Sequence, residues 1–205
     1  MIAGSEGNLG RVLTRLFQES GWRAIPYSKA SESVDLFIHA AARLKDGSQA
    51  ATIRSNIDFL QETIAFCELR HIQAFVYISS VSIHGAPQTK TIDENTPIHC
   101  NDLYSHSKYF GEGLVTNSPL THLILRIPAL LELKDNPTNF ISKLYRALTS
   151  HQDIRLNVSD APFNSFASPF DIFDVIVHFA DKPTSSTLVV AGNPDCTLTE
   201  IALYF

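Results

Sequence analysis

The chain has 205 residues, of which 44% are hydrophobic and 18% charged, and its formal net charge at pH 7 is -5. This composition is ordinary for a globular protein with a substantial core, and the acidic surplus argues against nucleic acid or an anionic membrane as the main partner. We expect neither a transmembrane helix nor a secretory signal, because there is no run of about 18 apolar residues and no basic stretch before an apolar one at the N-terminus. Three widely spaced cysteines indicate reduced thiols in a cytoplasmic protein.

Apolar runs typical of buried strands alternate along the chain with segments of helical periodicity. In chain order we expect a strand at 1–3, a helix that Gly21 ends, strands at 22–27 and 36–41, a helix around 57–67, a strand at 74–78, a helix at 102–115, a strand at 122–126, helices at 140–148 and 171–179, and a strand at 188–190. Strands that alternate with helices need crossover connections, so the order predicts an α/β fold with a parallel sheet covered on both faces.

Three regularly spaced glycines follow the first strand. Gly4, Gly7 and Gly10 form the pattern G-x-x-G-x-x-G between a strand and a helix. Glycine lets the backbone turn sharply and approach a pyrophosphate, and the next helix offers unpaired N–H groups to the phosphates. The pattern indicates a dinucleotide-binding turn, with a plain glycine-rich turn as the alternative.

The end of the second predicted strand lacks the acidic residue that usually holds the ribose of NAD. The sequence there reads Tyr27-Ser28-Lys29. Lys29 and Arg11 are cations that attract a 2′-phosphate, which favours NADP weakly over NAD. An equal alternative is that Lys29 is a solvated loop charge.

Tyr104 and Lys108 stand four residues apart in a predicted helix, so they share one face. A nearby ammonium stabilises a phenolate and lowers its pKa, which suits Tyr104 to acid–base catalysis. Ser79 and Ser80 end a buried strand at the sheet edge where ligands bind in open α/β folds. A hydroxyl there can hydrogen-bond the substrate oxygen on which Tyr104 acts. The alternatives are an exposed helix pair and a strand-end turn.

Taken in order, these motifs resemble the extended short-chain dehydrogenase/reductases, in particular the NAD-dependent epimerase/dehydratase family that acts on nucleotide sugars. Further segments at the family's positions carry the resemblance: DLFIHAA at 35–41, SNI at 55–57, FVYISSVSIHG at 75–85, Asp93-Glu94 with Pro97, YSHSKYFGE at 104–112 and LRIP at 125–128. The resemblance covers nearly the whole chain. It implies a Rossmann-like, doubly wound parallel sheet in residues 1–130. A small, partly interleaved substrate-binding region would follow in residues 131–205.

The resemblance also implies a mechanism. Tyr104 would be the acid–base group, Lys108 would hold the nicotinamide ribose and tune Tyr104, and Ser80 would orient the sugar oxygen. The expected function is therefore an NAD(P)-dependent epimerase or keto-reductase acting on a nucleotide-linked sugar. Because members of this family often pair through the two long helices that flank the sheet, a homodimer is also implied.

The residues implied to bind the cofactor are Gly4, Gly7, Asn8, Leu9, Gly10, Arg11, Lys29, Ala40, Ala41, Asn56, Ser79, Tyr104, Lys108 and Ile127. Those implied to bind the substrate are Ser80, Val81, Ser82 and Asn164. No metal is expected, because the spacing of His99, Cys100 and His106 matches no standard site.

The sequence departs from the family pattern in ways that narrow the chemistry. Only three residues precede Gly4, and residues 29–34 replace the helix–strand–helix that shapes the family's adenine pocket. No Asp-Glu pair follows Ser80, which disfavours 4,6-dehydration. The shortened segments favour an alternative, a non-catalytic dinucleotide-binding or scaffold protein on the same fold. The intact Ser80, Tyr104 and Lys108 argue against it.

Overall fold

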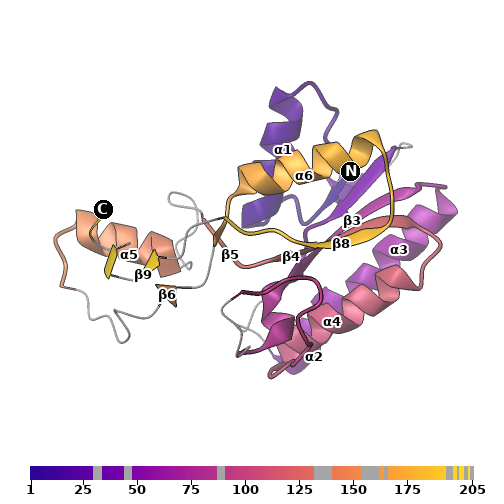
Figure 1. The fold of residues 1–205 in the computed structure, drawn as a ribbon. Helices are drawn as coiled ribbons and strands as arrows, with labels where there is room; N and C mark the ends of the chain where they lie inside the picture. Colours follow the sequence, from indigo (N-terminus) through magenta and orange to yellow (C-terminus); the bar gives the residue numbers. More distant parts are fainter. Residues whose placement is uncertain are drawn as a thin grey trace.

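The computed structural model describes residues 1–29, 34–43, 48–86, 91–131, 140–153, 162–163, 166–192, 196–197, 199–200 and 203. Within these residues, five parallel strands form one sheet in the order β1-β2-β3-β4-β8 (Figure 1). The strands are β1 (Ile2–Ala3), β2 (Leu36–His39), β3 (Ala74–Ser80), β4 (Thr121–Ile127) and β8 (Ser186–Val189). The predicted α/β class and parallel sheet are thus confirmed.

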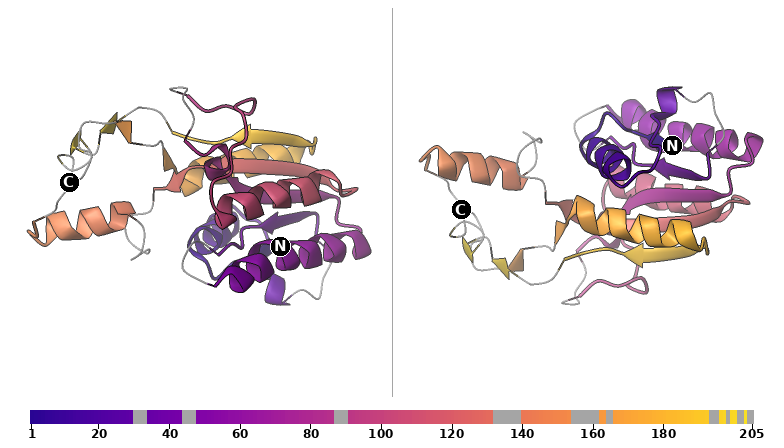
Figure 2. Two further views of the ribbon diagram at one scale, coloured as in Figure 1. Left: turned by 90° about the horizontal axis from the view of Figure 1, so that it is seen from below. Right: turned by 90° about the horizontal axis from the view of Figure 1, so that it is seen from above.

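Helices cover both faces of this sheet, with α1 and α6 on one face and α3 and α4 on the other (Figures 1 and 2). The helices are α1 (Asn8–Glu19), α2 (Gln49–Ile53), α3 (Phe59–Leu69), α4 (Leu103–Thr116), α5 (Phe140–Thr149) and α6 (Pro169–Asp181). A π-helical segment, Arg54–Asp58, joins α2 to α3, and short 3₁₀ turns span Tyr27–Lys29 and Val81–His84. In the part of the chain described, no helix is both long and apolar enough to cross a membrane.

Each face of the sheet packs its own core because the central strands are buried on both sides. On one face Leu13 of α1 and Ile176 of α6 pack against Val76 of β3. On the other face Leu60 of α3 and Val115 of α4 pack with the other set of strand side chains. The continuous apolar runs that predicted β2, β3 and β4 therefore mark strands covered on both faces.

The region 131–205 contributes to the sheet as well as to a smaller unit. Helix α6 packs beside α1, and β8 pairs with β4, although both follow residue 131. Elsewhere β5 (Ala129–Leu130) pairs with β7 (Phe166–Ala167), and β6 (Pro162–Phe163) pairs with β9 (Cys196–Thr197). Figure 1 shows α5, β6 and β9 set apart from the sheet and its helices. A boundary between residues 130 and 131 stays a prediction.

The strand predicted at 22–27 is wrong. Only Pro26 forms a bridge with Ile2, whose amide donates to the carbonyl of Ile25 at 2.9 Å. A proline has no N–H to continue a ladder, and the chain turns into the 3₁₀ segment at Tyr27. The helix predicted around 57–67 is longer than expected, because helical backbone runs from Gln49 through the π-helical segment to Leu69.

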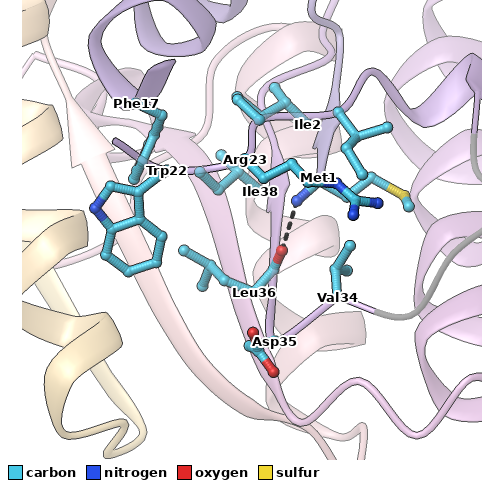
Figure 3. A pocket seen from close by; sticks show the side chains of 11 residues that line it. Met1, Ile2, Phe17, Trp22, Arg23, Val34, Asp35, Leu36 and Ile38 are labelled. Atoms are coloured by element: carbon cyan, nitrogen blue, oxygen red, sulfur yellow. Dashed lines mark hydrogen bonds between the residues drawn. The ribbon is translucent and has the colours of Figure 1, made fainter. Parts of the chain in front are cut away.

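A cavity of about 230 Å³ lies where β1 and β2 begin (Figure 3). Residues from both strands, from the end of α1 and from 22–25 line it, and the ammonium of Met1 donates to the carbonyl of Leu36 at 2.7 Å. This cavity is at the amino ends of the strands. The glycine turn and Ser80 stand at their carboxyl ends, so the cavity is not part of the candidate site.

Candidate active site

The glycine turn between β1 and α1 is packed so closely that side chains do not fit. Gly4 has φ +82°, and a Cβ on it would lie 2.6 Å from the amide nitrogen of Ala41. A Cβ on Gly10 would collide with the carbonyl oxygen of Gly4, to which the amide of Gly7 donates at 2.9 Å. Gly7 is also the N-cap of α1 and supplies no side-chain cap. The first-turn amides of α1 and this bare backbone fit the pyrophosphate of a dinucleotide.

Asn56 holds the loop that follows β2, in which Ala40 and Ala41 lie beside the glycine turn. Its Oδ1 accepts from the amide of Arg43 at 2.7 Å, and its Nδ2 donates to the Arg43 carbonyl at 3.1 Å. The same Nδ2 donates to Oγ of Ser107 on α4 at 2.9 Å. The buried Asn56 thus ties this loop to the helix that carries Tyr104 and Lys108, and its direct contact with a cofactor stays a prediction.

Tyr104 sits in the first turn of α4, opposite the end of β3. The helix begins at this point because Asp102 and Ser105 form a reciprocal capping box. The side chain of Ser80 lies close enough to the phenol of Tyr104 to lower its pKa. Ser80 ends β3, and its Oγ also accepts from the amide of Ser82 at 3.2 Å. The fold therefore brings together Tyr104 and Ser80, which are 24 positions apart in the sequence.

Lys108 lies beneath this pair and is only 2% exposed. Its ammonium donates to the carbonyl of Ile78 at 2.7 Å and stands 4.8 Å from the centre of the Tyr77 ring. Burial lowers the pKa of Lys108 to about 7, and the carboxylate of Glu112 acts in the opposite direction. Desolvation of the charged ammonium therefore outweighs the attraction of that carboxylate.

The expectation that Lys108 lowers the pKa of Tyr104 is not met in this structure. Burial raises the pKa of Tyr104, the hydrogen bond with Ser80 lowers it, and Asp102 raises it further. The shared helix face fixes the spacing of the two side chains but not the direction of the ammonium. That ammonium turns towards the carbonyl of Ile78.

A buried network not predicted from the sequence supports the site from behind. Glu112 accepts from the hydroxyl of Ser79 and from two nitrogens of Arg126. Arg126 also donates to the carbonyl of Glu94, and Oε1 of Glu94 accepts from the amide of Val189 at 2.7 Å. A carboxylate and a guanidinium inside otherwise apolar segments were the available signal, because charged groups are rarely buried unless they are paired.

The residues predicted to meet the substrate occupy the turn after β3. Val81 and Ser82 belong to its 3₁₀ segment, and Oγ of Ser82 is buried without a hydrogen-bond partner among the described residues. Nε2 of His84 is also buried and has no hydrogen-bond partner among the described residues. Ile127 ends β4 and is nearly buried. Asn164 lies outside the described residues.

Two cations predicted to favour NADP are exposed near the glycine turn. Arg11 is in the first turns of α1 and donates to Oδ1 of Asn8 at 3.3 Å, whereas Lys29 ends the 3₁₀ segment that follows Pro26. Leu9, the remaining residue of the turn, packs into the core. Among the described residues no three His, Cys, Asp or Glu side chains are placed to hold a metal ion.

These observations define a class of protein. An open parallel sheet covered on both faces, with a glycine turn after its first strand and hydroxyl, phenol and ammonium groups at its carboxyl edge, is a Rossmann-like fold of the dinucleotide-binding kind. The sequence profile of the NAD dependent epimerase/dehydratase family matches residues 28–191, so the chain belongs to that family. The glycine turn precedes the matched residues.

Solved structures share this fold over nearly the whole chain. The dTDP-4-dehydrorhamnose reductase of Bacillus anthracis, in complex with NADP, is 21% identical with a TM-score of 0.85, over 99% of this chain and 78% of that one. The UDP-glucuronic acid 4-epimerase of Bacillus cereus, in complex with NAD, is 16% identical with a TM-score of 0.82, over 96% and 79%. A search of curated proteins gave no match.

Proposed function

We propose that the chain is an NAD(P)-dependent enzyme that epimerises or reduces a nucleotide-linked sugar. The observation that carries this proposal is the placement of Tyr104 beside Ser80 at the carboxyl edge of the sheet, with Lys108 buried next to them on the same helix as Tyr104. Membership of the epimerase/dehydratase family supports it. Residues 1–130 would hold the cofactor, and residues 131–205 would supply much of the sugar site.

The chain's own residues account for the cofactor's contacts. The glycine turn and the amides at the start of α1 would hold the pyrophosphate, and the loop of Ala40 and Ala41 would border it. Lys108 uses one of its three N–H donors on Ile78, which leaves the others for ribose hydroxyls. Arg11 and Lys29 favour NADP weakly. The nicotinamide ring of the bound cofactor supplies hydride chemistry.

Tyr104 would move the proton that accompanies this chemistry. Because burial raises the pKa of its phenol, Tyr104 is protonated at neutral pH and is suited to donate a proton to a sugar carbonyl oxygen. Ser80 would donate a hydrogen bond to the same oxygen and so orient it. The hydroxyl of Ser82, which has no hydrogen-bond partner in the described part of the chain, supports a polar ligand in the adjoining turn.

The test is a calorimetric titration with NADPH and NADH, followed by a screen of nucleotide sugars that monitors absorbance of the reduced nicotinamide. We expect binding of at least one dinucleotide and turnover with at least one sugar. Absence of binding by both dinucleotides would overturn the proposal. Binding without turnover across the screen would favour the second candidate, a non-catalytic dinucleotide-binding or scaffold protein on the same fold.

We also propose that two copies pair through α2 and α4. These helices expose Ile53, Leu103, Tyr109 and Phe110 around a wide groove, and exposed apolar patches of this kind mark association surfaces. Analytical ultracentrifugation is the test. We expect a dimer that Phe110→Glu converts to a monomer, and a monomeric wild-type chain would contradict the proposal.

A further inference from the structure

Tyr77 lies under the ammonium of Lys108, at the place where β2 stops pairing with β3. The last pair of that ladder joins His39 to Tyr77, and Ile78 is the next residue of β3. The carbonyl of Ile78 accepts from Lys108 at 2.7 Å, while the ammonium stands 4.8 Å from the centre of the Tyr77 ring. A cation at this distance from an aromatic face is attracted by the ring quadrupole. Two neighbouring residues of one strand thus hold the same charge.

The ring of Tyr77 is itself held between the sheet and α4. It is fully buried, and its hydroxyl fills the space in which Gly111 of α4 has no side chain. A Cβ on Gly111 would collide with that hydroxyl and would lie 2.8 Å from Cζ of the ring. One turn of α4 therefore rests on Tyr77, and Lys108 extends from the same turn. The ring of Tyr77 is therefore packed between Gly111 and the ammonium of Lys108.

The hydroxyl of Tyr77 does not explain this arrangement, because it has no hydrogen-bond partner among the described residues. The other ionisable groups around the ammonium are His39 on β2 and, on α4, Glu112 and the protonated phenol of Tyr104. Burial, followed by the charge of Lys108, lowers the pKa of His39 to about 3, so its ring is neutral at neutral pH and offers the ammonium no counter-charge. The aromatic face of Tyr77 and the carbonyl of Ile78 are then the contacts that support the charge of the ammonium from the described part of the sheet.

We propose that Tyr77 is a positioning residue for Lys108, whose ring face holds the ammonium where it reaches the ribose of a bound dinucleotide. This inference rests on the proposed function for the role of Lys108 and on the geometry alone for the contact. In this proposal the aromatic ring of Tyr77, and not its hydroxyl, holds the ammonium of Lys108. A phenylalanine at residue 77 would therefore still hold the ammonium of Lys108, whereas an aliphatic side chain would not.

The first test measures the acylation rate of Lys108 against pH by mass spectrometry, on protein without cofactor. Loss of the ring face removes support for the charged form, so Tyr77→Leu should move the midpoint to lower pH, and Tyr77→Phe should leave it in place. A series of increasingly fluorinated phenylalanines at residue 77 keeps the ring's shape and weakens its quadrupole, and should lower the midpoint step by step. An unchanged midpoint across that series overturns the contact, even if Tyr77→Leu does not fold.

The second test is the dissociation constant for NADPH. Tyr77→Leu should weaken binding by about 2- to 30-fold, the range expected for loss of one cation–π contact, and Tyr77→Phe should restore the wild-type value. Equal weakening by Tyr77→Phe would overturn the assignment to the ring. If the wild-type chain binds no dinucleotide, the proposed function fails, while the acylation midpoints still decide whether Tyr77 positions Lys108.

Discussion

Glu112 of α4 and Arg126 of β4 form a buried two-point ion pair beneath the candidate active site. Nε of Arg126 lies 3.1 Å from Oε1 of Glu112, and the terminal nitrogen NH2 lies 2.8 Å from Oε2. The hydroxyl of Ser79 also donates to the carboxylate of Glu112, and Arg126 also donates to the carbonyl of Glu94. The pair therefore fixes α4 against the end of β3 and against the loop that precedes the helix.

Glu112→Gln should destabilise the fold by about 3–5 kcal/mol, because it leaves the guanidinium of Arg126 buried without a counter-charge. The two side chains are only 6% and 10% exposed, so solvent screens them little. Urea unfolding checks the prediction. Replacing both residues with methionine should cost less than Glu112→Gln alone, and a larger loss in the double variant would contradict this account.

Acid should unfold the protein partly through His39. Burial lowers the pKa of His39 to about 3 from an ordinary value of 6.5, so the unfolded chain binds a proton between these values that the folded chain does not. Stability should therefore fall as pH decreases from 6.5 towards 3, by on the order of 4 kcal/mol from this group. The check is the free energy of unfolding against pH for wild type and His39→Gln.

The His39→Gln chain should lose part of that acid dependence, whereas the exposed His106→Gln serves as the matched control. If His39→Gln and wild type show parallel pH profiles, His39 does not titrate as this structure implies.

The elements that form the sheet and its covering helices could largely be predicted because their signals are local. The apolar runs of β3 and β4 and the helical spacing from Ile57 to Cys67 report burial directly. The strand predicted at 22–27 was wrong because a single bridge at Pro26 does not sustain a strand. Its apolar pattern could not reveal how few ladder partners β1 offers.

The sequence could place candidate residues at one edge of the sheet, but it could not give the geometry of their side chains. The order of motifs places Ser80 and Tyr104 at one sheet edge, and the structure joins them. The ammonium of Lys108 contacts the carbonyl of Ile78 and the ring of Tyr77, and these are tertiary contacts that the spacing of residues along a helix does not reveal. The Glu112 pair joins residues from two elements in the same way, so helix periodicity gave no sign of it.

Tyr104→Phe should lower turnover by about 10²- to 10⁴-fold, the range expected for loss of a general acid–base group. Dinucleotide affinity should change little, because the phenol is expected to act on the substrate oxygen. Tyr109→Phe is the matched control, since Tyr109 is on the same helix and is exposed. Steady-state kinetics with the sugar identified in the screen is the measurement. Equal rates in the two variants would remove Tyr104 from the mechanism.

Gly4→Ala should abolish dinucleotide binding and destabilise the fold, because two effects act at once. The backbone of Gly4 has φ +82°, which an L side chain rarely adopts, and a Cβ would lie 2.6 Å from the backbone of Ala41. We expect a loss of about 1–3 kcal/mol in the free energy of unfolding, as for other strained backbone positions.

Gly113→Ala is the matched control for Gly4→Ala. Nothing lies within 4 Å of a Cβ on Gly113, which is inside α4, so alanine should stabilise that helix by about 0.5–1 kcal/mol. Thermal unfolding of both variants tests the predicted change in stability, and NADPH titration tests the predicted loss of binding. A Gly4→Ala chain that binds NADPH like the Gly113→Ala chain would show that the glycine turn does not cradle the pyrophosphate, since the added methyl group would collide with the backbone of Ala40 and Ala41 and displace the turn.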